Sequence, residues 1–115
     1  MNIMKKLEII INPGRLEELK EELNNLGIKG MMITNIMGFG NQKGTTQYYR
    51  GTEIEVNLLP KIKVEIVVSA EDLEGIIDSI CKVVSTGNIG DGKIFIYNVE
   101  DAVRIRTGER GNSAI

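Results

Sequence analysis

A glycine-rich segment from Thr86 to Lys93, with the sequence TGNIGDGK, carries the clearest chemical signal in the chain. Successive backbone N–H groups in such a turn can surround an anion, and the lysine adds a positive charge. The spacing also fits the G-x-x-x-x-G-K pattern of a P-loop, but Ile94 stands where a Ser or Thr would hold Mg²⁺, and the residues that follow alternate like a strand. The motif predicts either a phosphate-binding loop that is not an NTPase P-loop or an ordinary glycine turn before a strand.

Two arginines, Arg104 and Arg106, follow that segment on a stretch that we predict to be extended. Residues two apart on an extended chain project to the same side. The alternative is an edge strand whose charges oppose aggregation. Because the chain is acidic overall, with a net charge of −2, a local cationic group favours a specific anion. Together with Lys93 and the glycines, the arginines predict a polyphosphate ligand.

A second glycine-rich turn, GFGNQKG, covers residues 38–44. The side-chain oxygen of Gln42 can bind a hard cation, and Lys43 and Lys61 can pair with carboxylate or phosphate. The alternative is a flexible hinge with solvated lysines, and the spacing does not separate the two interpretations.

This turn opens a long polar segment, residues 38–60, between two predicted strands. Connections in compact domains usually have about 4–6 residues, and longer ones are usually functional or disordered. The segment carries Tyr48, Tyr49 and Arg50, residue types that anchor contacts between proteins. We therefore predict a loop that contacts a partner, with an insertion of no function as the alternative.

Composition excludes several classes of protein. The chain has 115 residues, which we interpret as a single domain spanning 1–115, and it contains no histidine, the commonest general base and zinc ligand. Its negative net charge argues against nucleic-acid binding by bulk charge. No apolar run approaches the ~20 residues needed to span a bilayer, and the N-terminus lacks a small-residue cleavage site, so we expect a cytoplasmic protein. The one cysteine, Cys81, is expected to be a buried thiol on the apolar stripe of a helix.

Hydrophobic periodicity predicts four strands and two helices. The strands cover residues 5–11, 31–39, 61–68 and 94–99, the helices cover 16–26 and 73–84, and residues 102–106 form a short extra strand. Asn12 with Pro13 is expected to begin the first helix and Gly27 to end it, while Ser69 with Asp72 should cap the second. The tail from Gly108 is polar and is expected to be mobile.

The order of these elements is typical of an α+β, ferredoxin-like βαββαβ fold with a long loop between strands 2 and 3. Two helices on one face of an antiparallel sheet leave the other face uncovered. That face carries apolar residues such as Ile10 and Val67, so we expect self-association.

Several segments in this order resemble the PII nitrogen signal-transduction proteins of the GlnB/GlnK type. They are GFGNQKG, YRGTEIEVNLLPKIKVEIVV, TGNIGDGKIFIYNVEDAVRIRTGE and the terminal AI. The resemblance covers Met4 to Ile115. It implies a trimer with nucleotide sites in the clefts between subunits, in which ATP and ADP compete. It also implies that 2-oxoglutarate binds beside ATP and Mg²⁺ and reshapes the T-loop, about residues 38–60, which docks on targets such as an ammonium channel.

The resemblance assigns roles to individual residues. Nucleotide binding falls on residues of the glycine turns, the third strand and the C-terminal segment: Gly38, Gly40, Glu65, Val67, Gly87, Gly90, Asp91, Gly92, Lys93, Arg104 and Arg106. Gln42, Lys43 and Lys61 are implied to bind 2-oxoglutarate, with Gln42 also a ligand of the Mg²⁺ held by ATP. Tyr49, Arg50 and Thr52 are implied to contact the partner.

Four positions depart from the family pattern. Ile54 occupies the place of the tyrosine that is uridylylated in enteric members, so that modification is expected to be absent. Met32 replaces a threonine that commonly contacts adenine, and Asn41 replaces an arginine that often holds phosphates. Asn12 replaces a basic residue near the oxoglutarate pocket. These changes bear on the ATP/ADP preference and on 2-oxoglutarate binding.

Three functions compete at this stage. The first is a regulator without enzymatic activity, a homotrimer without nucleic acid or membrane insertion, recruited to the membrane through an ammonium channel or acting on nitrogenase or glutamine synthetase. The second is a small ATP-hydrolysing enzyme, which would need a base near the γ-phosphate where no Asp or Glu clusters. The third is an RNA-binding module, for which Phe95 and Tyr97 share a face of the fourth strand.

Overall fold

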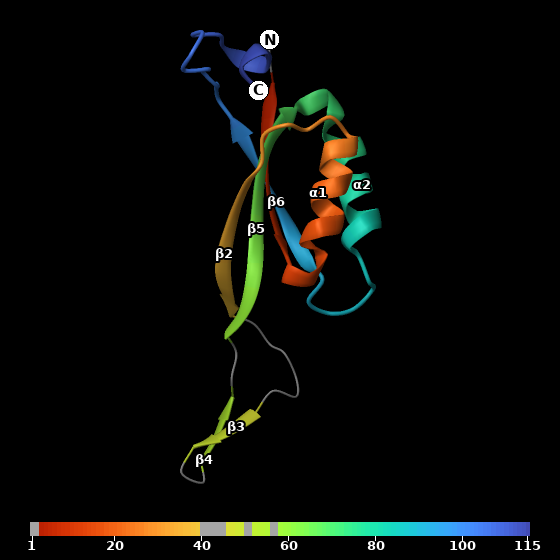
Figure 1. Cartoon of the computed structure of the whole chain (residues 1–115), viewed down its shortest axis with the longest axis vertical. Coiled ribbons are helices and arrows are strands. Elements are labelled where there is room, and N and C mark those ends of the chain that lie inside the picture. Colours follow the sequence, from red (N-terminus) through yellow and green to blue (C-terminus); the bar gives the residue numbers. More distant parts are fainter. Residues whose placement is uncertain (1–2, 40–45, 50–51, 56–57) are drawn as a thin grey trace.

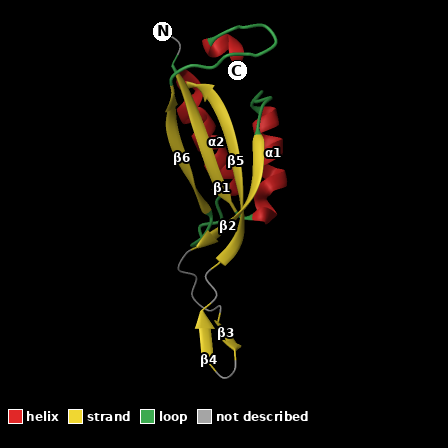
Figure 2. Cartoon of the chain, turned by 90° about the vertical axis from the view of Figure 1, so that its left-hand side faces the viewer, coloured by secondary structure: helices red, strands yellow, loops and turns green. Residues whose placement is uncertain are grey.

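The computed structural model describes residues 3–39, 46–49, 52–55 and 58–115. Four antiparallel strands form the main sheet in the order β2-β5-β1-β6. Their bounds are Met4–Ile11 for β1, Met32–Phe39 for β2, Leu58–Ser69 for β5 and Gly92–Val99 for β6. Two helices, α1 (Leu16–Asn25) and α2 (Leu73–Val84), cover one face of this sheet, and the other face is open (Figures 1 and 2). The predicted ferredoxin-like fold class is confirmed.

The core lies between the sheet and the two helices. In β1 the buried residues Leu7, Ile9 and Ile11 stand opposite Ile66, Val64 and Ile62 of β5. The buried residues of the helices are Leu19 and Leu23 of α1 and Ile76, Ile80 and Val84 of α2. Burying each such side chain stabilises the fold by about 1.5–3 kcal/mol. A slip of one residue would turn a whole strand's apolar set to the open face, so the core fixes the register and the positions of the loops at the strand ends.

At the helix ends, the backbone conformation agrees with the prediction from the sequence, but the predicted side-chain cap does not form. Gly27 has φ +80°, and the N–H groups of Gly27 and Ile28 donate to the carbonyls of Asn24 and Leu23 at 3.0 Å, which confirms the predicted helix end. Asn12 precedes a 3-10 turn, η1 (Pro13–Arg15), that leads into α1. The predicted cap at Ser69 is wrong: no side-chain cap hydrogen bond forms at the short 3-10 helix η2 (Ala70–Asp72) that precedes α2.

Cys81 is exposed, which contradicts the predicted buried thiol. Helix α2 turns Ile76, Ile80 and Val84 toward the sheet. Cys81 is one position beyond Ile80, about 100° further round the helix. No helix in the described part of the chain is long and apolar enough to cross a bilayer.

The long loop is shorter than predicted, because β2 and β5 continue to pair beyond the sheet's centre. Gly38 lies opposite Leu59 and Phe39 opposite Leu58, so the connection proper comprises residues 40–57. Pro60 falls beyond the end of β1, where β5 has only β2 as a neighbour, and a proline is accommodated there. Within the connection, β3 (Thr46–Tyr49) pairs with β4 (Thr52–Glu55), beyond the end of the main sheet (Figure 1).

The C-terminal segment is folded back and docked. Instead of an extra strand there is a single bridge between Val103 and Arg110, followed by a 3-10 helix, η3 (Gly111–Ala114). The buried Gly111 donates its N–H to the Ala102 carbonyl at 3.1 Å and to the Asp101 carboxylate at 3.2 Å. Asn112 Nδ2 donates to Ser69 Oγ at 2.9 Å. The expectation of a mobile tail is therefore wrong.

Candidate functional site

The predicted phosphate-binding turn, residues 86–92, which we call the phosphate loop, joins α2 to β6 and is closed by its own carboxylate. Thr86 and Gly87 donate their N–H groups to Asp91 Oδ2 at 2.7 and 2.9 Å, and the Thr86 hydroxyl donates to Oδ1. These hydrogen bonds, that of the Thr86 hydroxyl first, lower the pKa of Asp91. The Asp91 carboxylate already accepts from the N–H groups of Thr86 and Gly87, and the N–H of Asn88 donates to the Thr86 hydroxyl at 3.3 Å, so a phosphate would have to bind N–H groups beyond Asn88.

Gly92 ends the phosphate loop in a conformation that only glycine fits. Its φ is +126°, and a Cβ at this position would lie 1.9 Å from the Ile10 carbonyl oxygen. The close approach lets β6 begin directly against β1, with Gly92 opposite Ile11 and Lys93 opposite Ile10. Lys93 is exposed and stands at the exit of the loop.

Three segments meet beside the phosphate loop, in a group that we call the loop-base cluster: Asn12, Gly38, Lys61 and Gly90. Lys61 Nζ donates to Asn12 Oδ1 at 2.5 Å and to the Gly90 carbonyl at 3.2 Å. Asn12 Nδ2 donates to the same carbonyl at 3.0 Å. Gly38 lies against the Lys61 stem, since a Cβ on it would be 3.1 Å from Lys61 Cγ. The predicted residues Gly38, Lys61 and Gly90 are thus brought together.

The sequence predicts Asn12 as a helix start and as a departure from the family pattern, but it does not predict the contacts of Asn12 with Lys61 and Gly90. One signal could have found them: β1 ends where β5 begins, so Asn12 and Lys61 must lie at the same end of adjacent antiparallel strands.

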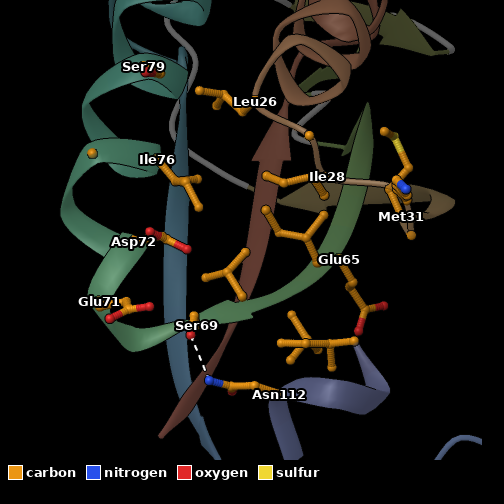
Figure 3. Close-up of a pocket in the computed structure, with 18 of the residues that line it drawn as sticks. Leu26, Ile28, Met31, Glu65, Ser69, Glu71, Asp72, Ile76, Ser79 and Asn112 are labelled. Carbon is orange, nitrogen blue, oxygen red and sulfur yellow. Dashed lines mark hydrogen bonds between the residues drawn. The ribbon is translucent and has the colours of Figure 1, made fainter. Parts of the chain in front are cut away.

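A second group lies at the other end of the sheet, around a cleft of about 1200 Å³. The connection from α1 to β2, strand β5, helix α2 and the C-terminal segment line it (Figure 3). Glu65, Val67 and Arg104 are among the lining residues, together with Met32 and Ile115. The hydrogen bond from Asn112 to Ser69 joins the C-terminal segment to β5 in this cleft (Figure 3).

Glu65 is held as an anion by two lysines on the open face. Its Oε2 lies 3.0 Å from Lys6 Nζ and its Oε1 lies 3.7 Å from Lys63 Nζ. The hydrogen bond from Lys6 lowers the pKa of Glu65 and raises the pKa of Lys6. Lys6 also lies 5.0 Å from the centre of the Tyr97 ring.

The two arginines do not project together from an extended strand, and that prediction is wrong. The N–H of Arg104 donates to the Glu109 carbonyl at 2.9 Å, and its Nη1 lies 3.3 Å from Glu109 Oε1. These contacts fold the chain into a loop and place Arg106 on an exposed turn. Of the two arginines, only Arg104 lines the cleft.

The phosphate loop and Arg104 are far apart within one chain, whereas Glu65 of the cleft is level with Phe95, two positions from Lys93. Lys93 pairs with Ile10 and Val99 pairs with Met4, so the length of β6 separates the phosphate loop from the segment that leads to Arg104. Six residues of strand span about 20 Å. The predicted gathering of Lys93, Arg104 and Arg106 around one polyphosphate therefore does not occur within a single chain. We call the phosphate loop, Lys93 and the loop-base cluster together the loop half-site, and the residues that line the cleft the cleft half-site.

The structure describes only some of the remaining predicted residues. Gly40, Gln42, Lys43 and Arg50 lie outside the described residues, as does Asn41. Tyr49 stands opposite Thr52 in the β3–β4 pair, and Ile54 lies in β4. Among the described residues, no group of three or more acidic or cysteine side chains is placed to bind a metal ion.

Comparisons with known proteins identify the family of the chain. The family model "Nitrogen regulatory protein P-II" matches residues 4–109. The nitrogen regulatory protein P-II of Rhizobium meliloti (strain 1021) is 53% identical over 112 residues, which cover 97% of this chain and all of the relative. The protein of the same name from Rhodospirillum rubrum is 52% identical over the same share of each chain.

Solved structures show the same fold. The structure of B. subtilis GlnK aligns with a TM-score of 0.81 at 41% identity and covers 98% of this chain and 99% of that one. The B. subtilis GlnK–ATP complex aligns at 0.79 and 34% identity, covering 98% of both chains. Arabidopsis thaliana PII bound to citrate aligns at 0.80 and 35% identity, covering 99% of this chain and 94% of its own. The chain belongs to the P-II family of nitrogen regulatory proteins.

Proposed function

We propose that this chain, as one PII-like domain, is a non-enzymatic regulator that binds ATP or ADP between the subunits of a homotrimer. The observation that carries the proposal is the separation of the phosphate loop from Arg104. The loop half-site supplies Lys93 and backbone N–H groups, and the cleft half-site supplies Glu65, Val67 and Arg104. Two copies that present opposite ends to one another would complete one site.

The open face of the sheet is the surface through which copies would associate. Met32, Phe95 and Tyr97 are 61%, 47% and 46% exposed, an unusual set of large apolar side chains for a solvated sheet. Covering apolar area stabilises an assembly by about 25 cal/mol per Å². The Lys6–Glu65 pair on the same face is already formed within one chain, so its charges would enter an interface paired.

The loop half-site has the donors needed for a nucleotide and a carboxylate. Lys93 and the N–H groups beyond Asn88 would bind phosphates, and Lys61 would pair with a carboxylate of 2-oxoglutarate. Gln42 has the hard oxygen that Mg²⁺ accepts, and Lys43, the next residue in the sequence, would add a second cation. A bound Mg²⁺ supplies open octahedral positions that a 2-oxo acid can fill with two oxygens. The solved GlnK–ATP and PII–citrate complexes show that similar chains bind a nucleotide and a polycarboxylate.

The connection 40–57 would contact the target proteins and so transmit the state of the ligand site to them. Its β3–β4 pair holds Tyr49 opposite Thr52, and it starts from the strand that contains Gly38, next to Lys61. A change at Lys61 or at Gln42 can therefore act on the loop's first residues directly. The target would be a nitrogen-metabolism protein, with an ammonium channel as the first candidate and nitrogenase or glutamine synthetase as alternatives. The regulator would then work in the cytoplasm and reach the membrane only through the channel.

Two measurements test this function. Sedimentation equilibrium at micromolar concentration should give three times the chain mass of 12.7 kDa, and a clean monomer would contradict the shared site. Calorimetry should show 2-oxoglutarate binding with ATP and Mg²⁺ but not with ADP and Mg²⁺ or without nucleotide. Linkage requires 2-oxoglutarate to tighten ATP by the same factor. Equal 2-oxoglutarate affinity under all three conditions would refute the mechanism.

A further inference from the structure

The side chain of Asn12 does not do what its place in the sequence suggests. An asparagine at the start of a helix usually accepts a hydrogen bond from the first turn. Asn12 precedes η1 but makes no side-chain cap hydrogen bond. Its amide instead crosses to two other segments: Nδ2 donates to Gly90 O at 3.0 Å, and Oδ1 accepts from Lys61 Nζ at 2.5 Å.

We propose that Asn12 is a positioning residue that ties Lys61 to the phosphate loop and thereby couples the carboxylate ligand to the nucleotide. The inference rests on the proposed function, because it takes Lys61 as the group that meets the carboxylate. It adds a residue of this chain that acts through its hydrogen bonds to Lys61 and Gly90 and that sets how strongly each ligand affects the other.

The first step of the argument is the orientation of Lys61. An ammonium group has three N–H donors. Two of them are directed to Asn12 Oδ1 and to the Gly90 carbonyl, so the third has a defined direction. Lysine is otherwise a flexible point charge on a four-carbon stem. A prepositioned donor binds a carboxylate better because less side-chain freedom is lost on binding.

The second step is the shared acceptor. The Gly90 carbonyl accepts hydrogen bonds from both Asn12 and Lys61, and it belongs to the phosphate loop. A phosphate that shifts this loop therefore changes the position of Lys61, and a carboxylate that draws on Lys61 changes the loop. Such a connected set of hydrogen bonds can carry a coupling free energy between two ligands.

The third step is the chemistry of the side chain. Asn12 donates to Gly90 and accepts from Lys61 at the same time, and its amide does so with two separate atoms, Nδ2 and Oδ1. A carboxylate would lose the donor and neutralise Lys61, and a cation would lose the acceptor and repel Lys61. Only glutamine retains both groups, on a longer stem.

The test is calorimetry on four full-length proteins: wild type, Asn12→Ala, Asn12→Gln and, as a matched control, Asn25→Ala at the exposed end of α1. ATP is titrated with Mg²⁺, with and without 2-oxoglutarate, and 2-oxoglutarate is titrated with ATP and Mg²⁺. We expect Asn12→Ala to weaken 2-oxoglutarate about tenfold, which corresponds to about 1.4 kcal/mol. ATP alone should change less than threefold, so the coupling factor falls. Asn12→Gln should recover part of the coupling, and Asn25→Ala should match wild type.

The possible outcomes distinguish a failure of the inference about Asn12 from a failure of the proposed function. If wild type binds 2-oxoglutarate with ATP and Asn12→Ala retains the full coupling factor, the inference is overturned and the proposed function stands. If Asn12→Ala weakens both ligands equally and Asn12→Gln recovers nothing, Asn12 has only a structural role and the inference is again overturned. If wild type binds no 2-oxoglutarate, the proposed function itself fails, and the inference with it. Should Asn12→Ala not fold by far-UV circular dichroism, the comparison of Asn12→Gln with wild type decides in the same way.

Discussion

Replacing Gly92 with alanine tests whether the phosphate loop depends on the close approach of β6 to β1. The new Cβ would lie 1.9 Å from the Ile10 carbonyl oxygen, 3.0 Å from its carbon and 3.3 Å from Ile11 Cα. All three are backbone atoms of a central strand, so no side chain can move aside. The two strands would have to separate by about 1 Å, an overpacking change that typically costs about 1–3 kcal/mol.

Backbone strain adds to this cost. Gly92 has φ +126°, a region that side chains rarely adopt, and such a conformation costs about 1–3 kcal/mol. Together the two effects should reduce the free energy of unfolding by about 2–6 kcal/mol, a large share of the 5–15 kcal/mol typical of a domain. The pairs Gly92–Ile11 and Lys93–Ile10 would open first, so Lys93 and the phosphate loop would shift with them.

Substitutions at two other glycines separate the cost of backbone strain from the cost of steric overlap. Gly87 has φ +79° with nothing within 4 Å of its Cβ position, so Gly87→Ala should cost about 1–2 kcal/mol from strain alone. Gly75 lies in α2 with open space, and Gly75→Ala should stabilise by about 0.4–1 kcal/mol. Urea unfolding followed by far-UV circular dichroism, at one protein concentration, measures all three. A Gly92→Ala protein as stable as Gly87→Ala would refute the predicted contact with Ile10.

Three further predictions concern the loop half-site. Lys93→Ala should weaken ATP about tenfold or more in calorimetry, because a hydrogen bond from a charged group is worth about 1.5–3 kcal/mol, and unchanged binding by a folded variant would remove Lys93 from the site. Gly38→Ala should weaken 2-oxoglutarate binding and change the free energy of unfolding little, since its Cβ would press on the Lys61 stem at 3.1 Å. A variant that binds 2-oxoglutarate as tightly as wild type would contradict this. Asp91 has a lowered pKa, so its contribution to stability is present above about pH 4 and is lost as pH falls through the folded-state pKa. Thermal unfolding of Asp91→Asn between about pH 2 and 6 should therefore show a shallower acid limb than wild type, and identical profiles would argue against the carboxylate's role in closing the loop.

The elements that the sequence predicted well are those fixed by local periodicity. Strict alternation in residues 61–68 placed Ile62, Val64 and Ile66 in the core, and the leucine spacing in residues 16–26 placed Leu19 and Leu23 there. A glycine at a helix end is likewise a local signal, and Gly27 has the backbone conformation it implies. Each of these depends on residues within one or two turns or on a single strand.

The features that the sequence did not predict depend on distant partners. Asn12 meets Gly90 and Lys61, which are 78 and 49 positions away. The expected extended segment with Arg104 and Arg106 fails because Glu109 folds it back, and Ser69 does not cap α2 but accepts a hydrogen bond from Asn112. The extra pairs that shorten the long loop arise because Phe39 and Leu58 lie opposite one another, which neither segment reveals alone.

The pairing of Phe39 with Leu58 has a consequence for how this family can change over evolutionary time. The two ends of the connection are held one strand spacing apart, about 5 Å, by the same ladder that carries the core. The sheet already meets the entropic cost of bringing those ends together, and this cost grows only slowly with the number of residues between them. Insertions, deletions and substitutions between positions 40 and 57 should therefore leave folding almost unaffected. If this stretch contacts the targets, as we propose, one scaffold can acquire new targets by changes within it, while Asn12, Lys61 and the phosphate loop stay unchanged.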